Sequence, residues 1–310
     1  MRTSSRTFAI ILTALAMASL TGCASAGASP SANPTVAVTP EATIAATPDV
    51  CAKANLKTLT AGKLTVGADN PAYPPYYQPS DPKPSGSVWE LGEPTNGKGL
   101  ESATAYAVAK QLGFTTDEVV WTPVPFDNAI QPGPKTFDIY LSQISYSADR
   151  AKAVDLSDGY FDLNQSVVAL KNSPITKVTT VAGLAAFKLG AQATTTSYSY
   201  IVDHIKPTAP ASAYDTNELA VAAVGAGQID GIVVDLPTAF YITGSGELAN
   251  SVIVGSLPTA GTVEHFSIAL DLGSSLTPCV NSALASLKAD GTLTSIVAAS
   301  ITAQGAPELK

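Results

Sequence analysis

The chain has 310 residues, 25 acidic and 17 basic side chains, a formal net charge of −8 and a pI near 4.7. Its length favours two domains, and its composition allows a core of ordinary size. The acidic balance argues against a nucleic-acid partner, because no basic surface is available to neutralise phosphates. Two histidines, three dispersed cysteines and no Cys-x-x-Cys leave little material for a metal site, so we expect neither metal nor cofactor.

The N-terminus has the pattern of an export signal. Two arginines precede an apolar run over residues 8–20 that is too short to span a bilayer. The run ends in Leu20-Thr-Gly-Cys23, which resembles the lipobox of bacterial lipoproteins, where the cysteine is lipidated and becomes the first residue. We therefore expect a signal peptide over residues 1–22 and a lipid on Cys23. The alternative is an ordinary signal peptide that is cleaved near Ala24 or Ala26, with no role for Cys23.

A polar, nearly uncharged segment follows the proposed lipidation site. Residues 23–50 consist mainly of Ala, Ser, Thr and Pro, which predicts a flexible tether. The globular body of the protein, from residue 51 onward, would then work outside the cytoplasm and be anchored to the cell membrane. If Cys23 is lipidated, Cys51 and Cys279 remain as an even pair in an oxidising compartment, which favours a disulfide over two buried free thiols.

The first part of the body alternates strand and helix signals. We predict strands over 63–68, 119–124 and 137–141 and a helix over 99–113. Residues 78–98 contain several Pro and Gly and are expected to form a long loop with an exposed Trp89, which either reaches over a cleft or packs on its own loop. Ser147 is expected to cap a short helical turn that contains Arg150.

The second part of the body repeats this alternation. We predict strands over 166–170, 188–192, 231–234, 251–254 and 266–270 and helices over 194–204, 217–225 and 276–287, with Gly291 as a C-terminal cap. Strands that alternate with helices are typical of the α/β class with largely parallel sheets. No motif of a nucleophile elbow, phosphate-binding loop, dinucleotide fold or zinc protease is present, so nothing in the sequence requires an enzyme.

Four polar segments follow predicted strands, where ligands of open α/β sheets bind. They are Asp69 with Tyr73, the segment from Ser142 to Arg150, the threonines 194–196, and Asp235. Five further stretches carry the same resemblance: Phe137-Asp-Ile, Arg150-Ala-Lys-Ala-Val-Asp-Leu-Ser, Gly62-Lys-Leu-Thr-Val-Gly, Gly225-Ala-Gly-Gln-Ile-Asp230 and Leu287-Lys-Ala-Asp-Gly291. Together with the four segments, they resemble the amino-acid-binding proteins of ABC importers, which are the extracellular solute-binding proteins of family 3. The resemblance covers nearly all of residues 51–300.

The resemblance implies a two-lobed periplasmic-binding-protein fold of type II, in which each lobe is a mostly parallel sheet flanked by helices. Lobe 1 would comprise residues 51–164 plus 262–310, and lobe 2 residues 165–261. Two hinge strands near 165–168 and 259–265 would join them.

The resemblance also assigns roles to the groups that bind the main-chain part of a ligand. Arg150 would grip the α-carboxylate, and Asp235 would bind the α-ammonium. Ser145, Thr195 and Thr196 would donate hydrogen bonds to the carboxylate. The alternatives are a helix-surface arginine for Arg150, a helix cap for Asp235 and simple N-capping for the threonines.

Other positions would contact the ligand side chain. Tyr73 and Phe126 would sandwich it, Asp69 would reach a polar or cationic group, and Ser142 would line the pocket. Gln143 departs from the Ser or Gly that relatives often have, and its amide would fill part of the pocket or add a hydrogen bond. For Asp69 the alternative is turn chemistry at the end of a strand.

These expectations describe a monomeric, membrane-tethered receptor without catalytic residues. It would capture a free, polar amino acid by hinge closure and deliver it to an ABC permease with its ATPase. Two alternatives stay open: an extracytoplasmic dehydratase or lyase with Asp69 as the acid or base, and a ligand-sensing surface lipoprotein.

Overall fold

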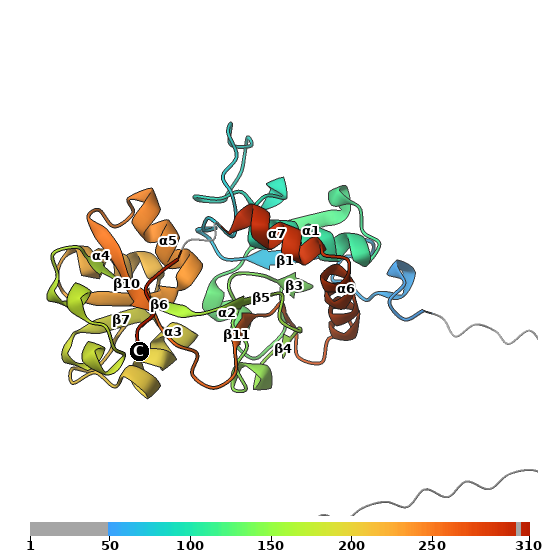
Figure 1. Cartoon of the computed structure of the whole chain (residues 1–310). Helices are drawn as coiled ribbons and strands as arrows, with labels where there is room; N and C mark the ends of the chain where they lie inside the picture. Colours follow the sequence, from blue (N-terminus) through green and yellow to red (C-terminus); the bar gives the residue numbers. More distant parts are fainter. Residues whose placement is uncertain (1–48, 302–304) are drawn as a thin grey trace, which may run out of the picture. The chain divides into compact units, whose positions relative to one another are not determined.

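Short apolar runs of the sequence form the strands of three sheets. The computed structural model describes residues 49–301 and 305–310, so the expected signal peptide, Cys23 and most of the tether lie outside the described residues. Figure 1 shows the arrangement of the described elements. Among them, no helix is both long and apolar enough to cross a membrane.

The first sheet contains the strands that precede the expected binding segments. Its order is β2 (Val119–Pro123), β1 (Leu64–Ala68), β3 (Ile139–Tyr140), β12 (Ala269–Leu270) and β4 (Asp155–Leu156). The strand β1 pairs in parallel with β2 and β3, whereas β12 pairs antiparallel with β3 and β4.

Four of the described helices lie around this sheet (Figure 1), and each contributes buried apolar residues. They are α1 (Leu100–Gln111), α2 (Phe126–Ile130), α6 (Thr277–Ala289) and α7 (Thr292–Ser300). The first sheet with these helices is the first half of the body, and the second sheet with its helices is the second half. The helix α1 begins after Gly99, where a side chain cannot fit because a Cβ atom would lie 2.4 Å from the carbonyl oxygen of Tyr76. The side chains of Leu64 and Val66 on β1 are fully buried in the resulting core.

The second sheet has the order β10 (Ser251–Ser256), β6 (Gln165–Leu170), β9 (Gly231–Asp235), β7 (Leu189–Gln192) and β8 (Ser212–Tyr214). Separate apolar clusters cover its two faces. The surrounding helices are α3 (Thr196–Tyr200), which continues as a π-helical turn (Ile201–Ile205), α4 (Asn217–Gly225) and α5 (Leu236–Ser245).

Both large sheets are mixed, which corrects the expectation of mostly parallel sheets. In the second sheet, β7 is parallel to β8 and β9, but β6 is antiparallel to both β9 and β10. The antiparallel strands β6, β10 and β12 lie next to the connections between the sheets. The strands β6 and β12 enter their sheets directly from these connections rather than through a helical crossover, so no handed crossover makes them parallel to their neighbours. The strand β10 follows α5 and runs in the same direction as β9, and it is antiparallel only to β6, which lies between them.

Two chain segments connect the large sheets and pair with each other. The strand β5 (Phe161–Leu163) leads into β6, and β11 (Glu264–Phe266) returns from β10 to β12. These strands form an antiparallel two-stranded sheet in which Glu264 pairs with Leu163. The expected single strand over 266–270 is therefore wrong, since β11 and β12 belong to different sheets.

The last described residues pack on the second sheet rather than the first. Glu308 forms a parallel bridge with Ser256, and Leu309 is buried in the apolar cluster on one face of that sheet. Gly255 makes room for this segment, because a Cβ atom there would lie 2.7 Å from Cγ of Leu309. The C-terminal segment 305–310 thus differs from the sequence expectation, which assigned the chain end to the first lobe.

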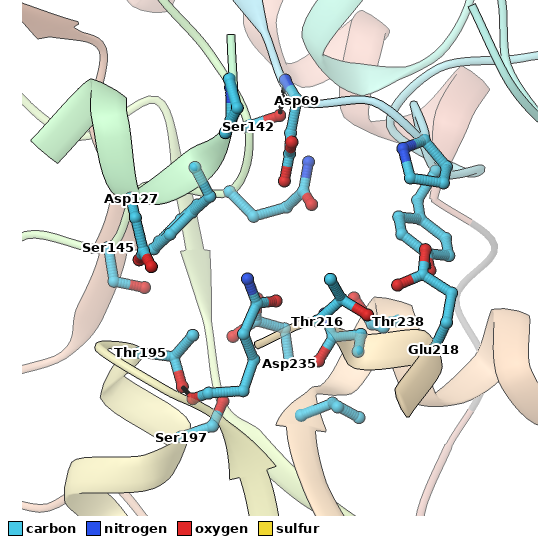
Figure 2. A pocket seen from close by; sticks show the side chains of 18 of the residues that line it. Asp69, Asp127, Ser142, Ser145, Thr195, Ser197, Thr216, Glu218, Asp235 and Thr238 are labelled. Atoms are coloured by element: carbon cyan, nitrogen blue, oxygen red, sulfur yellow. Dashed lines mark hydrogen bonds between the residues drawn. The ribbon is translucent and has the colours of Figure 1, made fainter. Parts of the chain in front are cut away.

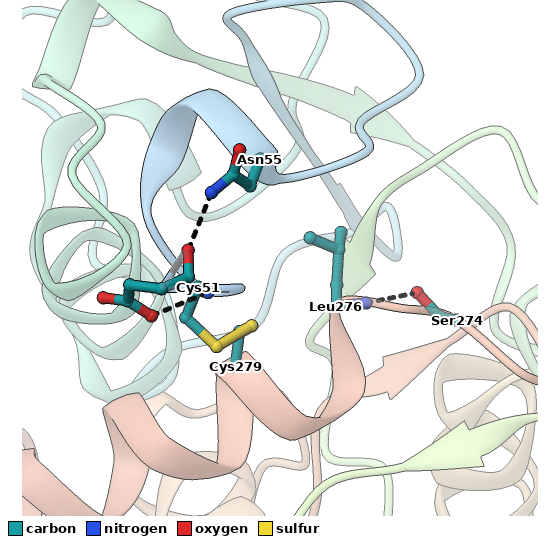
Figure 3. Close-up of a disulfide and its surroundings, with 6 residues drawn as sticks. Cys51, Asn55, Ser274, Leu276 and Cys279 are labelled. Carbon is teal, nitrogen blue, oxygen red and sulfur yellow. Dashed lines mark hydrogen bonds between the residues drawn. A yellow bond between two sulfur atoms is a disulfide. The ribbon is translucent and has the colours of Figure 1, made fainter. Parts of the chain in front are cut away.

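Two further details concern Trp89 and the cysteines. Trp89 is only 3% exposed and packs in the core of the first half, so the expectation of an exposed tryptophan is wrong. Cys51 and Cys279 form a disulfide with a Cα–Cα distance of 5.3 Å (Figure 3). It ties the segment before β1 to α6, and both elements belong to the first half of the body.

Candidate functional site

A cavity of about 230 Å³ lies between the ends of strands from the two large sheets. All ten predicted binding residues line it, namely Asp69, Tyr73, Phe126, Ser142, Gln143, Ser145, Arg150, Thr195, Thr196 and Asp235. Figure 2 labels five of them, Asp69, Ser142, Ser145, Thr195 and Asp235, and shows their side chains around the cavity. The grouping follows from the topology, because the carboxyl ends of β1, β3, β7 and β9 open towards the same space.

Arg150 is the basic side chain of the cavity wall. It is 8% exposed, lies in the short turn Arg150–Lys152, and its backbone N–H donates to Ser147 Oγ at 3.1 Å, as the expected cap requires. The guanidinium donates to the carbonyl oxygens of Ser145 and Thr194, the latter at 3.0 Å. A guanidinium has five N–H donors, so these bonds leave donors for a ligand carboxylate.

An aromatic ring supports the guanidinium of Arg150. The carbon Cζ lies 5.6 Å from the centre of the Phe126 ring, within the range of a cation–π contact. Phe126 is the first residue of the short helix α2. The ring therefore contacts the arginine in this structure, in addition to lining the cavity as expected.

Asp235 ends β9 and comes immediately before α5. Its Oδ1 accepts a hydrogen bond of 2.7 Å from Nε2 of Gln165, and its side chain makes no capping bond to the helix, so the capping alternative does not apply. Burial, followed by the negative charge of Glu264, raises the pKa of Asp235 well above its usual value. A buried carboxyl with these neighbours favours a cationic partner.

Gln165 links this carboxylate to the connection between the sheets. The same amide nitrogen donates to Oε2 of Glu264 on β11 at 3.0 Å, and the Gln165 amide oxygen accepts from Ser197 Oγ at 2.6 Å. Sequence reasoning did not find Gln165 or Ser197, because their roles depend on partners 32 to 99 residues away in the chain.

Thr195 and Thr196 begin the helix α3. The hydroxyl of Thr195 accepts a hydrogen bond from the N–H of Tyr198 at 3.1 Å and donates to the carbonyl oxygen of Gln192 at 2.7 Å. Thr195 is thus the N-cap, one of the two alternatives left open for these threonines.

The residues after β3 form a rigid wall of the cavity. Ser142 Oγ accepts a hydrogen bond from the N–H of Asp69 at 3.0 Å, so the ends of β1 and β3 are joined. Gln143 has a positive φ of 52°. Its backbone N–H and side-chain amide both donate to the buried carboxylate of Glu101 on α1, which also accepts from the hydroxyl of Tyr160.

Asp69 points into the cavity from the end of β1 (Figure 2). Burial is the main cause that raises its pKa to about 6, and the negative charges of Glu218 and Asp127 raise it further. A hydrogen bond from the N–H of Asn70 acts in the opposite direction. Asp69 therefore titrates near neutral pH rather than near its ordinary value.

Several contacts join the two halves across the cavity. The hydroxyl of Tyr73 donates to Glu218 on α4, and Thr194 Oγ1 donates to Oδ1 of Asp127 at 2.6 Å. Tyr73 also meets Tyr241 edge to face with ring centres 6.0 Å apart. Tyr73 is thus held at the cavity wall by a carboxylate and a second aromatic ring.

Further residues of the cavity wall were not found from the sequence. They are Asn70, Pro71, Pro125, Asp127, Gln192, Ser197, Asp215, Thr216, Asn217, Glu218, Val234 and Thr238. One sequence signal could have located Asp215 to Glu218. The helix predicted over 217–225 begins with polar residues, and these residues follow a strand that was not predicted from the sequence. That strand, β8, is only three residues long and half-buried, so it shows little hydrophobic alternation.

The family follows from comparison with known sequences. The model of the bacterial extracellular solute-binding proteins, family 3, matches residues 64–301. The chain belongs to this family. A comparison with curated protein sequences finds no match.

Solved structures of amino-acid-binding proteins share the fold. An ancestral arginine-binding protein bound to arginine is 26% identical, with a TM-score of 0.61, over 78% of this chain and 99% of that one. An ancestral arginine-binding protein bound to glutamine is 27% identical, with a TM-score of 0.61, over 76% of this chain and 96% of that one.

A more distant structure shows the fold alone. The arginine-, lysine-, histidine-binding protein ArtJ from Geobacillus stearothermophilus is 20% identical, with a TM-score of 0.60, over 76% of this chain and 93% of that one. The α/β architecture of this family 3 chain therefore matches two-lobed periplasmic binding proteins.

Proposed function

We propose that this family 3 protein is an extracytoplasmic receptor that captures a free, polar amino acid and delivers it to an ABC permease with its ATPase. The observation that carries the proposal is the placement of Arg150 and Asp235 in the wall of one cavity. A buried guanidinium with unused donors complements a carboxylate, and a buried carboxylate complements an ammonium group. The main-chain groups of an amino acid provide this pair.

Closure of the cavity follows from the same proposal. Residues 51–164 with 262–301 form one lobe and residues 165–261 the other, joined by the paired connections β5–β6 and β10–β11. The Tyr73–Glu218 and Asp127–Thr194 contacts then join the lobes in the closed form. A ligand that binds both lobes favours that form, and the permease reads the difference between closed and open.

Two solved relatives support a polar ligand, since one ancestral arginine-binding protein holds arginine and another holds glutamine. The lipid on Cys23 and the tether place the receptor at the cell membrane. Mass spectrometry of the mature N-terminus tests the anchor, because a lipidated Cys23 gives a mass that an unmodified terminus does not.

Calorimetric titration of the purified protein with each of the twenty amino acids tests the function. We expect saturable binding of one amino acid or a small group. Arg150→Ala should reduce the affinity at least ~100-fold, because it removes one partner of a buried charge pair. Lys152→Ala is the matched control, since Lys152 lies in the same turn but its side chain is exposed. Retention of no amino acid by the wild type contradicts the proposal.

A second candidate rests on Asp69. A carboxyl with a pKa of about 6 is suited to donate a proton, and a 27% identical ancestral amino acid-binding protein is described as a precursor of cyclohexadienyl dehydratase. A dehydratase would turn over its substrate, whereas a receptor returns its ligand unchanged. Product analysis after prolonged incubation therefore separates the two.

A further inference from the structure

The cavity contains far more negative than positive groups. Its acidic side chains are Asp69, Asp127, Asp215, Glu218 and Asp235, and Arg150 is its one basic side chain among the residues that the structure describes. In the proposed function, Arg150 binds the α-carboxylate and Asp235 the α-ammonium. Four carboxylates then remain around the space that the ligand side chain occupies.

Two of these carboxylates act on each other. Asp69 comes from the end of β1 and Glu218 from the first turn of α4, and both are half-buried. Figure 2 shows the two side chains at the cavity from different sides. The charge of Glu218 is one of the causes that raise the pKa of Asp69, which indicates repulsion between the groups.

The other two carboxylates are less available to a ligand side chain. Asp127 already accepts a hydrogen bond from Thr194, and Asp215 is exposed to solvent. Glu218 accepts from the hydroxyl of Tyr73, a neutral donor that does not compensate its charge. The side chain of Tyr73 lines the same cavity, and an aromatic ring can attract a cationic group.

We infer that the ligand side chain is positively charged and that Asp69 and Glu218 bind it from the two halves of the body. This inference rests on the proposed function and narrows it from polar to cationic amino acids. A guanidinium or ammonium group between two carboxylates relieves their repulsion. A neutral amide leaves both charges partly desolvated and uncompensated, so the site rejects it.

The test compares L-arginine with L-citrulline, which has nearly the same shape but a neutral ureido group, by calorimetric titration. We expect arginine to bind at least ~100-fold more tightly than citrulline, because citrulline leaves two partly desolvated carboxylates without a cationic partner. Glu218→Gln should reduce that ratio at least ~10-fold, and Asp69→Asn provides a second variant if the first fails to fold. Asp158→Asn, an exposed carboxylate outside the cavity, should leave the ratio unchanged.

The outcomes separate the two proposals. Equal or tighter binding of citrulline or glutamine overturns the cationic inference and leaves the amino-acid receptor intact. An unchanged ratio in both Glu218→Gln and Asp69→Asn also overturns it, because these carboxylates would then not contact the side chain. Binding of no amino acid at all overturns the receptor proposal, and the cationic inference with it.

Discussion

Binding of a cationic amino acid should release a proton from Asp69. In the closed cavity of this structure, burial and the charges of Glu218 and Asp127 raise the pKa of Asp69 to about 6. A cation placed against this carboxylate lowers its pKa towards the ordinary value of 3.8. At pH 6 about half of the free molecules have a protonated Asp69, so binding should release about 0.5 proton per ligand, falling to about 0.1 at pH 7.

The sign of the pH dependence follows from the same linkage. Because the bound state holds fewer protons, the affinity for arginine should fall as the pH decreases below 6, by about tenfold between pH 7 and pH 5. Asp235 also has a raised pKa, but in the proposed complex it faces the α-ammonium, which arginine and citrulline share. The difference in pH dependence between arginine and citrulline therefore reports the titration of Asp69 alone.

Calorimetric titrations in buffers of different ionisation enthalpy measure the number of protons released. We expect arginine to release more protons than citrulline at pH 6 in the wild type, and we expect this difference in proton release to disappear in Asp69→Asn. Equal proton release for both ligands, or the same difference in Asp69→Asn, would refute the assignment of Asp69 to the ligand side chain.

Three further predictions concern stability and are measured by urea unfolding. Replacing Cys51 and Cys279 by Ser should lower the free energy of unfolding by about 5 kcal/mol, because the disulfide closes a loop of 228 residues; a loss below about 1 kcal/mol would contradict this entropic account. Glu101 is fully buried, and burial raises its pKa to about 7 despite hydrogen bonds from Tyr160 and Gln143. The contribution of Glu101 to the free energy of unfolding is therefore fully present below its ordinary pKa of 4.5 and is lost as the pH rises through 7. The free energy of unfolding of the wild type should thus fall by about 2 to 3 kcal/mol between pH 5 and pH 8. Glu101→Gln should remove this loss, and a variant with the wild-type pH profile would show that another group causes it. Leu309→Ala should cost about 3 kcal/mol because Leu309 is 2% exposed, whereas the exposed neighbour substitution Glu308→Ala should stay within about 0.5 kcal/mol; equal effects would mean that the C-terminal segment does not pack on the second sheet.

The sequence alone predicted the elements whose signals are local. The helix expected over 99–113 is α1, and the strand expected over 231–234 is β9, because a helical repeat or a continuous buried run is visible within ten residues. Elements with weak periodicity were missed or misjudged. The strand β8 is short and half-buried, and the run 266–270 looks continuous although β11 and β12 pair in different sheets.

The sequence also determined which segments form the cavity wall. The four segments that follow predicted strands contain nine of the ten predicted residues of the wall, because the carboxyl ends of parallel strands meet at one edge of each sheet. The tenth, Phe126, was assigned only through the resemblance to family 3. The resemblance to family 3 added roles for Arg150 and Asp235, and these roles remain proposals.

Only the tertiary structure decided which groups face each other across the cavity. The contact of Tyr73 with Glu218 joins residues 145 positions apart, and no local pattern predicts it. The raised pKa of Asp69 likewise depends on burial and on charges from two other elements. A local sequence pattern predicts the backbone conformation and the buried face of a helix or strand. The electrostatics of a site depend instead on distances between charged groups, and these distances are set only when both halves of the body have packed.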